Sequence, residues 1–256
     1  MKISLAFASL FLLFACAPEK PDELGGGEQE TETTGELSAL ASDNYQGSKN
    51  QARGYYSSGS LRSPNQLPSE GFGFVKVARP RNFGFGTYDL VEILKETAAA
   101  LQRKFPSRDR VMIGDLSRNR GGDLPGHNSH QNGLDADVAF IRLDQTEQDA
   151  EDIGGFAEHF VKDGELTPNF DLKRNWYYAK LLARTKRVER IFVGEVIKKG
   201  FCAYAARRGE LETERETLRR LRVISGHTDH FHVRVGCPKK SLSCKPQVEI
   251  PDEPAC

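Results

Sequence analysis

The segment "HFHVRVG", His230–Gly236, constrains the fold more narrowly than any other part of the chain. Side chains of a β-strand point alternately to its two faces, so a strand here would carry polar residues on one face and apolar residues on the other. The polar residues are His230, His232 and Arg234, and the apolar residues are Phe231, Val233 and Val235. A register slip of one residue would turn both histidines into the core. The segment therefore predicts a strand that holds two imidazoles on the same face.

Histidine is rare in this chain and strongly clustered. Five of the six histidines lie in two short segments, Gly126–His130 and Gly226–His232, and the first is followed by Asp135 and Asp137. Two imidazoles and one carboxylate form a ligand set typical of catalytic zinc, with a fourth position open to water. The histidines could instead be loop caps or an exposed strand face, and Asp135 a turn residue. Because five of six are clustered, we favour a metal site.

The spacing of His130 and Asp137 is that of two metal ligands supplied by different structural elements. Six residues separate His130 from Asp137, which suits a loop ligand and a strand ligand that meet at one ion. His159 falls outside both clusters, beside Phe156 and Phe160, and we expect it to be structural. We read Ser129 as part of the loop and not as a nucleophile.

Charge and composition argue against a polyanionic partner. The chain has 36 basic and 36 acidic residues, so it has no net field to attract nucleic acid, and we expect no nucleic-acid binding. The hydrophobic fraction of 38% and the charged fraction of 28% are those of a polar protein. A length of 256 residues fits one large domain or two small ones.

The first residues have the pattern of an export signal. A basic start is followed by an apolar run that is too short to span a bilayer and ends in "LFAC" at Cys16. We interpret residues 1–15 as a signal peptide of the lipoprotein type and residues 16–53 as a lipidated Cys16 with a flexible tether. An ordinary cleaved signal peptide is the alternative. We expect a periplasmic protein tethered to the outer membrane, with the lipid at Cys16 as its only membrane contact.

The other four cysteines predict disulfides. An exported chain with an even number of cysteines and no CxxC spacing favours two bridges over a zinc site. Of the three possible connectivities we favour Cys237–Cys244, which closes a short loop after the HxH strand, together with Cys202–Cys256, which would fasten the C-terminus.

The remaining pattern predicts a single α+β domain over residues 54–256. We expect short strands and turns from Gly54, and a helix that begins at the N-cap Thr87. Arg110–Leu116 is expected to be a buried strand, and residues 175–185 a helix followed by a strand at 190–194. A charged helix should lie within 209–223, with a Glu216–Arg220 pair and with Leu211, Leu218 and Leu221 turned inward. No βαβ rhythm is present, so we expect a small, mainly antiparallel sheet flanked by helices and long loops.

Two longer segments resemble a known family. "GDLSRNRGGDLPGHNSHQNGLDADVAF" and "GHTDHFHVRV" are similar to the signature regions of the penicillin-insensitive murein endopeptidases, which belong to the lysostaphin and D-alanyl-D-alanine metallopeptidase group. The similarity continues through "GYYSSGSL", "LPSEGFGF", "RNW" and "RVERIFV" and covers residues 54–256. The resemblance implies a zinc peptidase that hydrolyses D-alanyl-diaminopimelyl cross-links of peptidoglycan.

The resemblance also assigns roles to residues. The residues that match the metal ligands are His130, Asp137 and His232. The residues that match active-site histidines are His230, His127 and His227, with His230 beside the metal as a proton acceptor or as a stabiliser of the oxyanion. Asp135 matches an aspartate that is not normally a ligand. The family commonly has a further cysteine pair, one of them near Ser60, which this chain lacks, so the attachment of the N-terminal segment is open.

Two other functions remain open on the residues alone. A carboxypeptidase or dipeptidase that trims uncross-linked stem peptides would use the same metal site. A non-catalytic lipoprotein that binds peptidoglycan could share the fold without the activity. The residues do not distinguish D,D from L,D cross-links.

Overall fold

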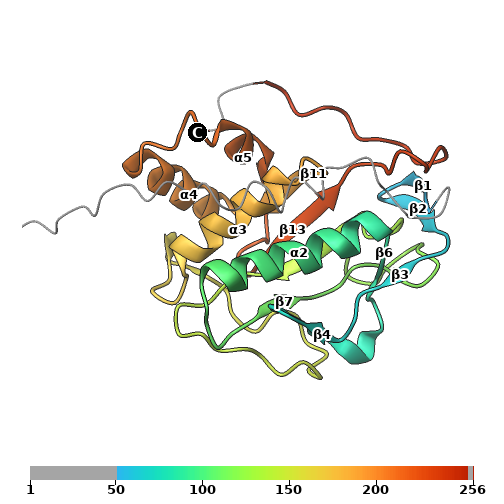
Figure 1. The fold of residues 1–256 in the computed structure, drawn as a ribbon, viewed down its shortest axis with the longest axis horizontal. Helices are drawn as coiled ribbons and strands as arrows, with labels where there is room; N and C mark the ends of the chain where they lie inside the picture. Colours follow the sequence, from blue (N-terminus) through green and yellow to red (C-terminus); the bar gives the residue numbers. More distant parts are fainter. Residues whose placement is uncertain (1–50, 253–255) are drawn as a thin grey trace, which may run out of the picture. The chain divides into compact units, whose positions relative to one another are not determined.

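The computed structural model describes residues 51–252 and Cys256, which form an α+β unit (Figure 1). The four α-helices of this part of the chain are α2 (Tyr88–Lys104), α3 (Leu172–Arg184), α4 (Glu195–Arg207) and α5 (Arg215–Arg220). A single 3₁₀ turn, η1, spans Arg79–Arg81. The predicted fold class is confirmed.

One seven-stranded sheet carries most of the core. Its strands lie in the order β12 (Leu221–Val223), β11 (Val188–Val193), β13 (His230–Val235), β8 (Asp135–Ala139), β7 (Val111–Ile113), β5 (Phe74–Lys76) and β4 (Glu70–Gly71). Two neighbouring pairs, β11–β12 and β5–β7, are parallel, and the other pairs are antiparallel. The sheet is therefore mixed and mainly antiparallel, as expected.

Three two-stranded ladders complete the described sheets, and all of them use short strands. They pair β1 (Ala52–Tyr55) with β2 (Ser58–Leu61), β3 (Asn65–Gln66) with β6 (Phe85–Gly86), and β9 (Val161–Lys162) with β10 (Glu165–Leu166). Short strands and turns were predicted for the region that begins at Gly54, and β1 to β6 confirm this.

The two faces of the sheet have different chemistry. On one face, Phe231, Val233 and Val235 of β13 are buried in the main core with Val138 of β8 and Ile113 of β7. Helices α2, α3 and α4 cover this face (Figure 1). The alternation predicted for "HFHVRVG" is confirmed, so the two histidines of β13 face the opposite side.

Helix α2 begins where the sequence predicts. The Thr87 hydroxyl accepts a hydrogen bond from the backbone N–H of Leu90 at 3.4 Å, and Asp89 lies in the first turn. This cap satisfies one of the amide groups that the first turn of a helix leaves unpaired. The apolar positions Leu90, Ile93 and Leu94 then face the core.

Replacing the cap should weaken the protein measurably. We expect Thr87→Ala to lower the free energy of unfolding by about 1 kcal/mol, because a buried amide loses its hydroxyl acceptor. Urea unfolding followed by circular dichroism measures this difference. Thr87→Ser keeps the hydroxyl and is the control; an equal loss in the serine variant would assign the effect to the missing methyl group and not to the cap.

The C-terminal third departs from prediction at two points. Helix α4 was not predicted, although Ile197, Phe201 and Ala205 repeat every four residues and are fully buried. Leu211 was predicted to face inward, and this is wrong: its side chain is 39% exposed because α5 begins only at Arg215. Leu218 and Leu221 are buried as expected.

Both predicted disulfides are present, and they fasten the C-terminal segment. Cys202–Cys256 spans 54 residues and Cys237–Cys244 spans seven, with Cα–Cα distances of 5.8 Å in each. The second bridge also lies beside the first strand, since the Gly54 N–H donates to the carbonyl of Ser243 and the Gly54 carbonyl accepts from Lys245. Backbone hydrogen bonds thus attach the N-terminal hairpin without a cysteine near Ser60.

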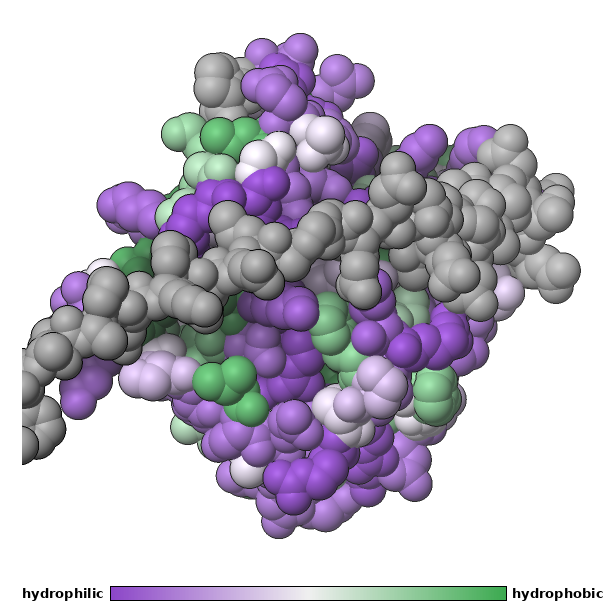
Figure 2. All heavy atoms as spheres, turned by 60° about the vertical axis from the view of Figure 1, so that its left-hand side comes forward, coloured by the Kyte–Doolittle hydropathy of each residue, from purple (hydrophilic) through white to green (hydrophobic). Residues whose placement is uncertain are grey.

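The export signal, Cys16 and most of the expected tether lie outside the described residues. Within the described part, no helix combines the length and apolar character that a membrane span requires. Hydrophilic side chains predominate on the face shown in Figure 2, with hydrophobic residues in small separate groups. This surface agrees with the polar composition.

Candidate active site

The pairing of β8 with β13 assembles the centre of the site. In this antiparallel ladder His232 lies opposite Asp137, Arg234 lies opposite Asp135, and His230 lies opposite Ala139. Residues directly opposite on one face are about 4.5–5.5 Å apart at Cβ, so the register alone brings these side chains into contact. The site face of the sheet is therefore built from strands that are distant in the sequence.

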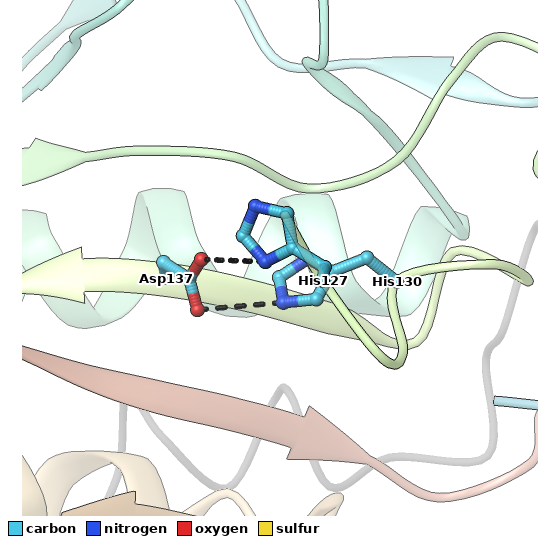
Figure 3. A group of neighbouring side chains, drawn as sticks. All are labelled: His127, His130 and Asp137. Carbon is cyan, nitrogen blue, oxygen red and sulfur yellow. Dashed lines mark ion pairs between the residues drawn. The ribbon is translucent and has the colours of Figure 1, made fainter. Parts of the chain in front are cut away.

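A loop places two more histidines against Asp137. His127 and His130 lie in the loop that leads into β8, and both point at the Asp137 carboxylate (Figure 3). His130 is fully buried and has φ of 65°, in the left-handed region that is unfavourable for a residue with a side chain. Such strain persists where the surroundings fix the residue, and it is common at functional sites.

Four imidazoles converge on the Asp137 carboxylate. Nδ1 of His127 lies 3.6 Å from Oδ2, while Nε2 of His130 lies 3.4 Å, Nε2 of His230 3.5 Å and Nδ1 of His232 3.8 Å from Oδ1. One ring nitrogen of each histidine thus faces the same point.

The other ring nitrogen of each of these histidines is held by an acceptor. The pairs are His127 Nε2 with Asp115 Oδ2 (3.3 Å), His130 Nδ1 with the Leu116 carbonyl (2.6 Å), His230 Nδ1 with Asp229 Oδ1 (2.6 Å) and His232 Nε2 with Asp135 Oδ1 (2.8 Å). Carboxylates and carbonyls only accept, so each outer nitrogen carries the proton. In the neutral rings, four inner lone pairs then face the centre.

Burial and neighbouring charges shift the pKa values of the ionisable groups in this centre. Burial raises the pKa of Asp137, but the surrounding histidines outweigh it and hold that pKa well below its usual range. Burial lowers the pKa of His130, yet the Asp137 carboxylate raises it to about 9. For His232, burial dominates and lowers the pKa to about 4.

The residues fit a metal ion. Within the part of the chain that the structure describes, His130 Nε2 and Asp137 Oδ1 are buried without a hydrogen-bond partner. Buried polar atoms are rarely left unpaired, so a nitrogen and an oxygen that face each other in this way fit a cation between them. Tetrahedral ligands at zinc distances are about 3.3 Å apart, close to the nitrogen-to-oxygen distances observed here.

Among the described residues, one group of side chains that could hold a metal ion differs from the predicted ligand set. Ligand atoms of His127, His130 and Asp137 lie within 4.8 Å of one another. The prediction named His130, Asp137 and His232 as ligands and His127 as a catalytic residue. The structure brings all four together, and His232 is the more buried of the two alternatives, with 11% of its side chain exposed against 20% for His127.

A pocket of about 450 Å³ opens beside this centre. His127, His230 and Asp137 line it together with Asp115, Arg81 and Phe156. His130 and His232 lie outside the lining, so they are behind the residues that a substrate would touch.

The remaining sequence-predicted residues lie around this centre. The ring of His227 is 4.8 Å from that of His230, and its Nδ1 is 3.1 Å from the Ser225 carbonyl, so it packs against a histidine of the cluster. His159 is exposed and lies 2.9 Å from the Thr228 hydroxyl, outside the cluster, as expected. Asp135 is fully buried and contacts His232 and Arg234, so it supports the site and is not a turn residue.

Three residues that hold side chains of the site were not predicted from the sequence. Asp115 and Asp229 hold histidines, and Arg81 holds Asp115 at 2.6 Å. Asp229 is adjacent to His230 in "TDHFH", which is a detectable signal. Arg81 lies 34 residues before Asp115, and no motif connects them.

Comparison with known proteins identifies the family. The model of the penicillin-insensitive murein endopeptidases matches residues 52–256. The chain belongs to this family. The resemblance stated from the two signature segments is thereby confirmed, and with it the prediction of a murein endopeptidase.

Curated relatives agree with the family match. A penicillin-insensitive murein endopeptidase of Klebsiella pneumoniae (strain 342) is 30% identical over 214 residues, which cover 82% of this chain and 75% of that protein. The protein of that name from Escherichia coli O17:K52:H18 is 32% identical over 210 residues, covering 80% and 73%. One from Haemophilus influenzae is 29% identical over 209 residues, covering 79% and 69%.

Proposed function

We propose that this protein is a zinc-dependent endopeptidase that hydrolyses D-alanyl-diaminopimelyl cross-links of peptidoglycan. The observation that carries the proposal is the convergence of four imidazole nitrogens on the Asp137 carboxylate, each with its opposite nitrogen held by an acceptor. Fixed outer hydrogen bonds of this kind are typical of histidines that bind or flank a metal. The murein substrate is proposed from the names of the curated relatives, and the D-alanyl-diaminopimelyl bond from the resemblance of the two signature segments.

We assign the ligands to His130, Asp137 and His232. All three are buried, and together they offer two neutral imidazoles and one carboxylate, a set found in catalytic zinc sites. His127, His230 and His227 are assigned to the active site, since the first two line the pocket and the ring of the third lies 4.8 Å from that of His230. When bound, zinc supplies a nucleophilic water at neutral pH and polarises the scissile carbonyl.

Proton transfer and orientation of the reacting groups are assigned to side chains of this protein. Asp229 accepts the Nδ1–H of His230, which leaves Nε2 free to take a proton from the nucleophile and deliver it to the leaving amine nitrogen. Asp115 leaves Nδ1 of His127 free on the opposite side, where it can orient the nucleophile or the substrate amide. No serine nucleophile is needed.

For location, we propose the periplasm, with an outer-membrane tether through a lipid on Cys16. The support is the apolar run that ends at "LFAC" and the peptidoglycan substrate implied by the relatives. Mass analysis of the mature N-terminus tests the lipid; an unmodified N-terminus at another residue would contradict it.

The activity can be tested on cross-linked peptidoglycan. We expect protein that starts after Cys16 to convert muropeptide dimers to monomers, to lose this activity with a zinc chelator and to regain it when zinc is added. Mass analysis of the muropeptides measures the conversion. Because the mechanism uses no serine, a β-lactam should leave the rate unchanged.

The other outcomes distinguish the alternatives. Intact dimers with shortened stems would indicate a carboxypeptidase. Intact dimers and intact stems, with a folded and zinc-loaded protein, would contradict the proposal and favour a binding lipoprotein.

A further inference from the structure

Arg81, at the end of the 3₁₀ turn η1, contacts both walls of the pocket. Its Nη1 donates to Asp115 Oδ2 at 2.6 Å. Its Nε and Nη2 donate to the Ile153 carbonyl at 2.9 and 2.6 Å, and Nη2 also donates to the Gly154 carbonyl at 2.8 Å. A planar guanidinium can hold several acceptors in fixed directions at once, which lysine cannot do.

The first wall is the one that holds His127. Asp115 is buried with 3% of its side chain exposed, and the same Oδ2 oxygen meets both Arg81 and His127 Nε2. A carboxylate oxygen accepts a hydrogen bond, so Asp115 holds the ring proton of His127 on Nε2 and leaves Nδ1 facing Asp137.

The second wall is the one that holds His230. Two residues after Gly154, the half-buried ring of Phe156 lies 5.3 Å from the imidazole of His230, tilted by 37°. Phe156 also fits against Gly114, where even a methyl group would come within 2.6 Å of the ring. The loop that carries this ring is held at two places: the Gln148 side chain bonds Gly155 and Ala157, and Arg81 bonds the carbonyls of Ile153 and Gly154.

We propose that Arg81 is a positioning residue that orients both histidines of the pocket: His127 through Asp115, and His230 through the Ile153–Gly154 backbone and Phe156. This inference rests on the proposed function, in which these two histidines handle the nucleophile and the proton. The hydrogen bonds of the Arg81 side chain go to Asp115 and to backbone carbonyls, so the orienting effect proposed here acts through those groups.

Four variants separate the two effects of Arg81. One effect acts on His127 through Asp115 (the His127 arm), and the other acts on His230 through the Ile153–Gly154 backbone and Phe156 (the His230 arm). Asp115→Asn breaks the His127 arm, because an amide can donate as well as accept and no longer dictates the tautomer. Phe156→Ala breaks the His230 arm. Arg81→Gln breaks both. Arg79→Gln is the matched control, since Arg79 lies in the same turn and pairs with Glu151 of the same loop at 3.2 Å, with no contact to Asp115 among its hydrogen bonds.

The direct measurement is the imidazole ¹⁵N and ring-proton spectrum of the zinc-loaded protein, with kcat, KM and zinc content measured beside it. We expect Asp115→Asn to shift the His127 nitrogens alone, Phe156→Ala the His230 signals alone, Arg81→Gln both, and Arg79→Gln neither. We expect kcat of Arg81→Gln and Asp115→Asn to fall about 10–100-fold, the range of outer hydrogen-bond partners in metal sites, with zinc still bound. The KM should change much less than kcat.

Several results would overturn the proposal. Unchanged His127 signals in both Asp115→Asn and Arg81→Gln would remove the tautomer role, and unchanged His230 signals in both Phe156→Ala and Arg81→Gln would remove the loop role. A loss of kcat in Arg79→Gln equal to that of Arg81→Gln, or a loss that follows zinc content, would show that Arg81 only stabilises the fold.

If Arg81→Gln does not fold, Arg81→Lys replaces it, and we expect the His230 signals to shift because one ammonium cannot hold both carbonyls and Asp115.

Failure of the proposed function would look different. A wild-type protein that leaves every cross-link intact contradicts the endopeptidase assignment. The imidazole spectra of the variants still report whether Arg81 orients the two rings.

Discussion

Asp137→Asn is expected to abolish zinc binding and turnover together. The asparagine has the same size, but it replaces the one carboxylate on which four imidazoles converge with a neutral amide. Two imidazoles without the negative charge hold zinc far more weakly, and the lost charge stabilisation of several kcal/mol corresponds to a fall in kcat/KM of more than about 10³-fold. Metal analysis after dialysis and the muropeptide dimer assay measure the two effects.

Asp163→Asn is the matched control. Asp163 has φ of 52° in the exposed turn between β9 and β10, a conformation that asparagine adopts as well as aspartate does. We expect normal zinc content and normal activity. An Asp137→Asn protein that keeps one zinc per chain and cleaves dimers at the wild-type rate would remove Asp137 from the ligand set.

The second large effect is expected at His230. His230→Ala should keep its zinc and lose about 10²–10⁴-fold in kcat, the usual contribution of a positioned acid–base group. The reason is geometric: His230 lines the pocket and its Nε2 faces the centre, while the proposed ligands His130 and His232 lie behind. His232→Ala, by contrast, should lose both metal and turnover.

His159→Ala controls for the loss of an imidazole elsewhere on the same surface, because His159 contacts Thr228 and lies outside the cluster. Zinc content, KM and kcat of the three variants are compared on purified muropeptide dimers. A His230→Ala enzyme with wild-type kcat would exclude the proton-transfer role. One that loses zinc in step with activity would make His230 a ligand.

Local signals in the sequence predicted the parts of the fold that local interactions determine. The cap at Thr87 and the apolar spacing after it located α2 because both act within a few residues. Alternation located β13 because burial of Phe231, Val233 and Val235 fixes its faces. The Glu216–Arg220 pair was correct for the same reason, at 2.6 Å within one helical turn.

Where the chain departs from the prediction, tertiary packing determines the structure. Helix α4 contains Gly200 and a mixed polar pattern, yet it is helical because Ile197 and Phe201 fill the core under the sheet. Leu211 matched an inward helical position, but the turn before α5 leaves it exposed. The spacing of Ile197, Phe201 and Ala205 was a local signal for α4, whereas the exposure of Leu211 is not visible from spacing alone.

In the candidate site, too, the residues with local sequence signals were predicted, and those that depend on tertiary contacts were not. The histidines and Asp137 were found because they cluster in the sequence, and the strand faces placed His230 and His232 together. Asp115 and Arg81 were missed because their roles arise only when a 3₁₀ turn, a strand end and a loop meet in space. The acceptor that fixes His127 therefore had to come from the structure, whereas Asp229 is adjacent to His230 in the sequence.

The ladder between β8 and β13 also controls when the protein can become active. His232 meets Asp135 across 97 residues of chain, and the proposed ligands lie on both strands and on the loop before β8. A chain that is still folding has no complete set of proposed ligands until β13 pairs with β8, and such distant pairing is slow compared with helix formation. Until β8 and β13 pair, the proposed ligands are not brought together, so we expect no hydrolysis by a partly folded chain.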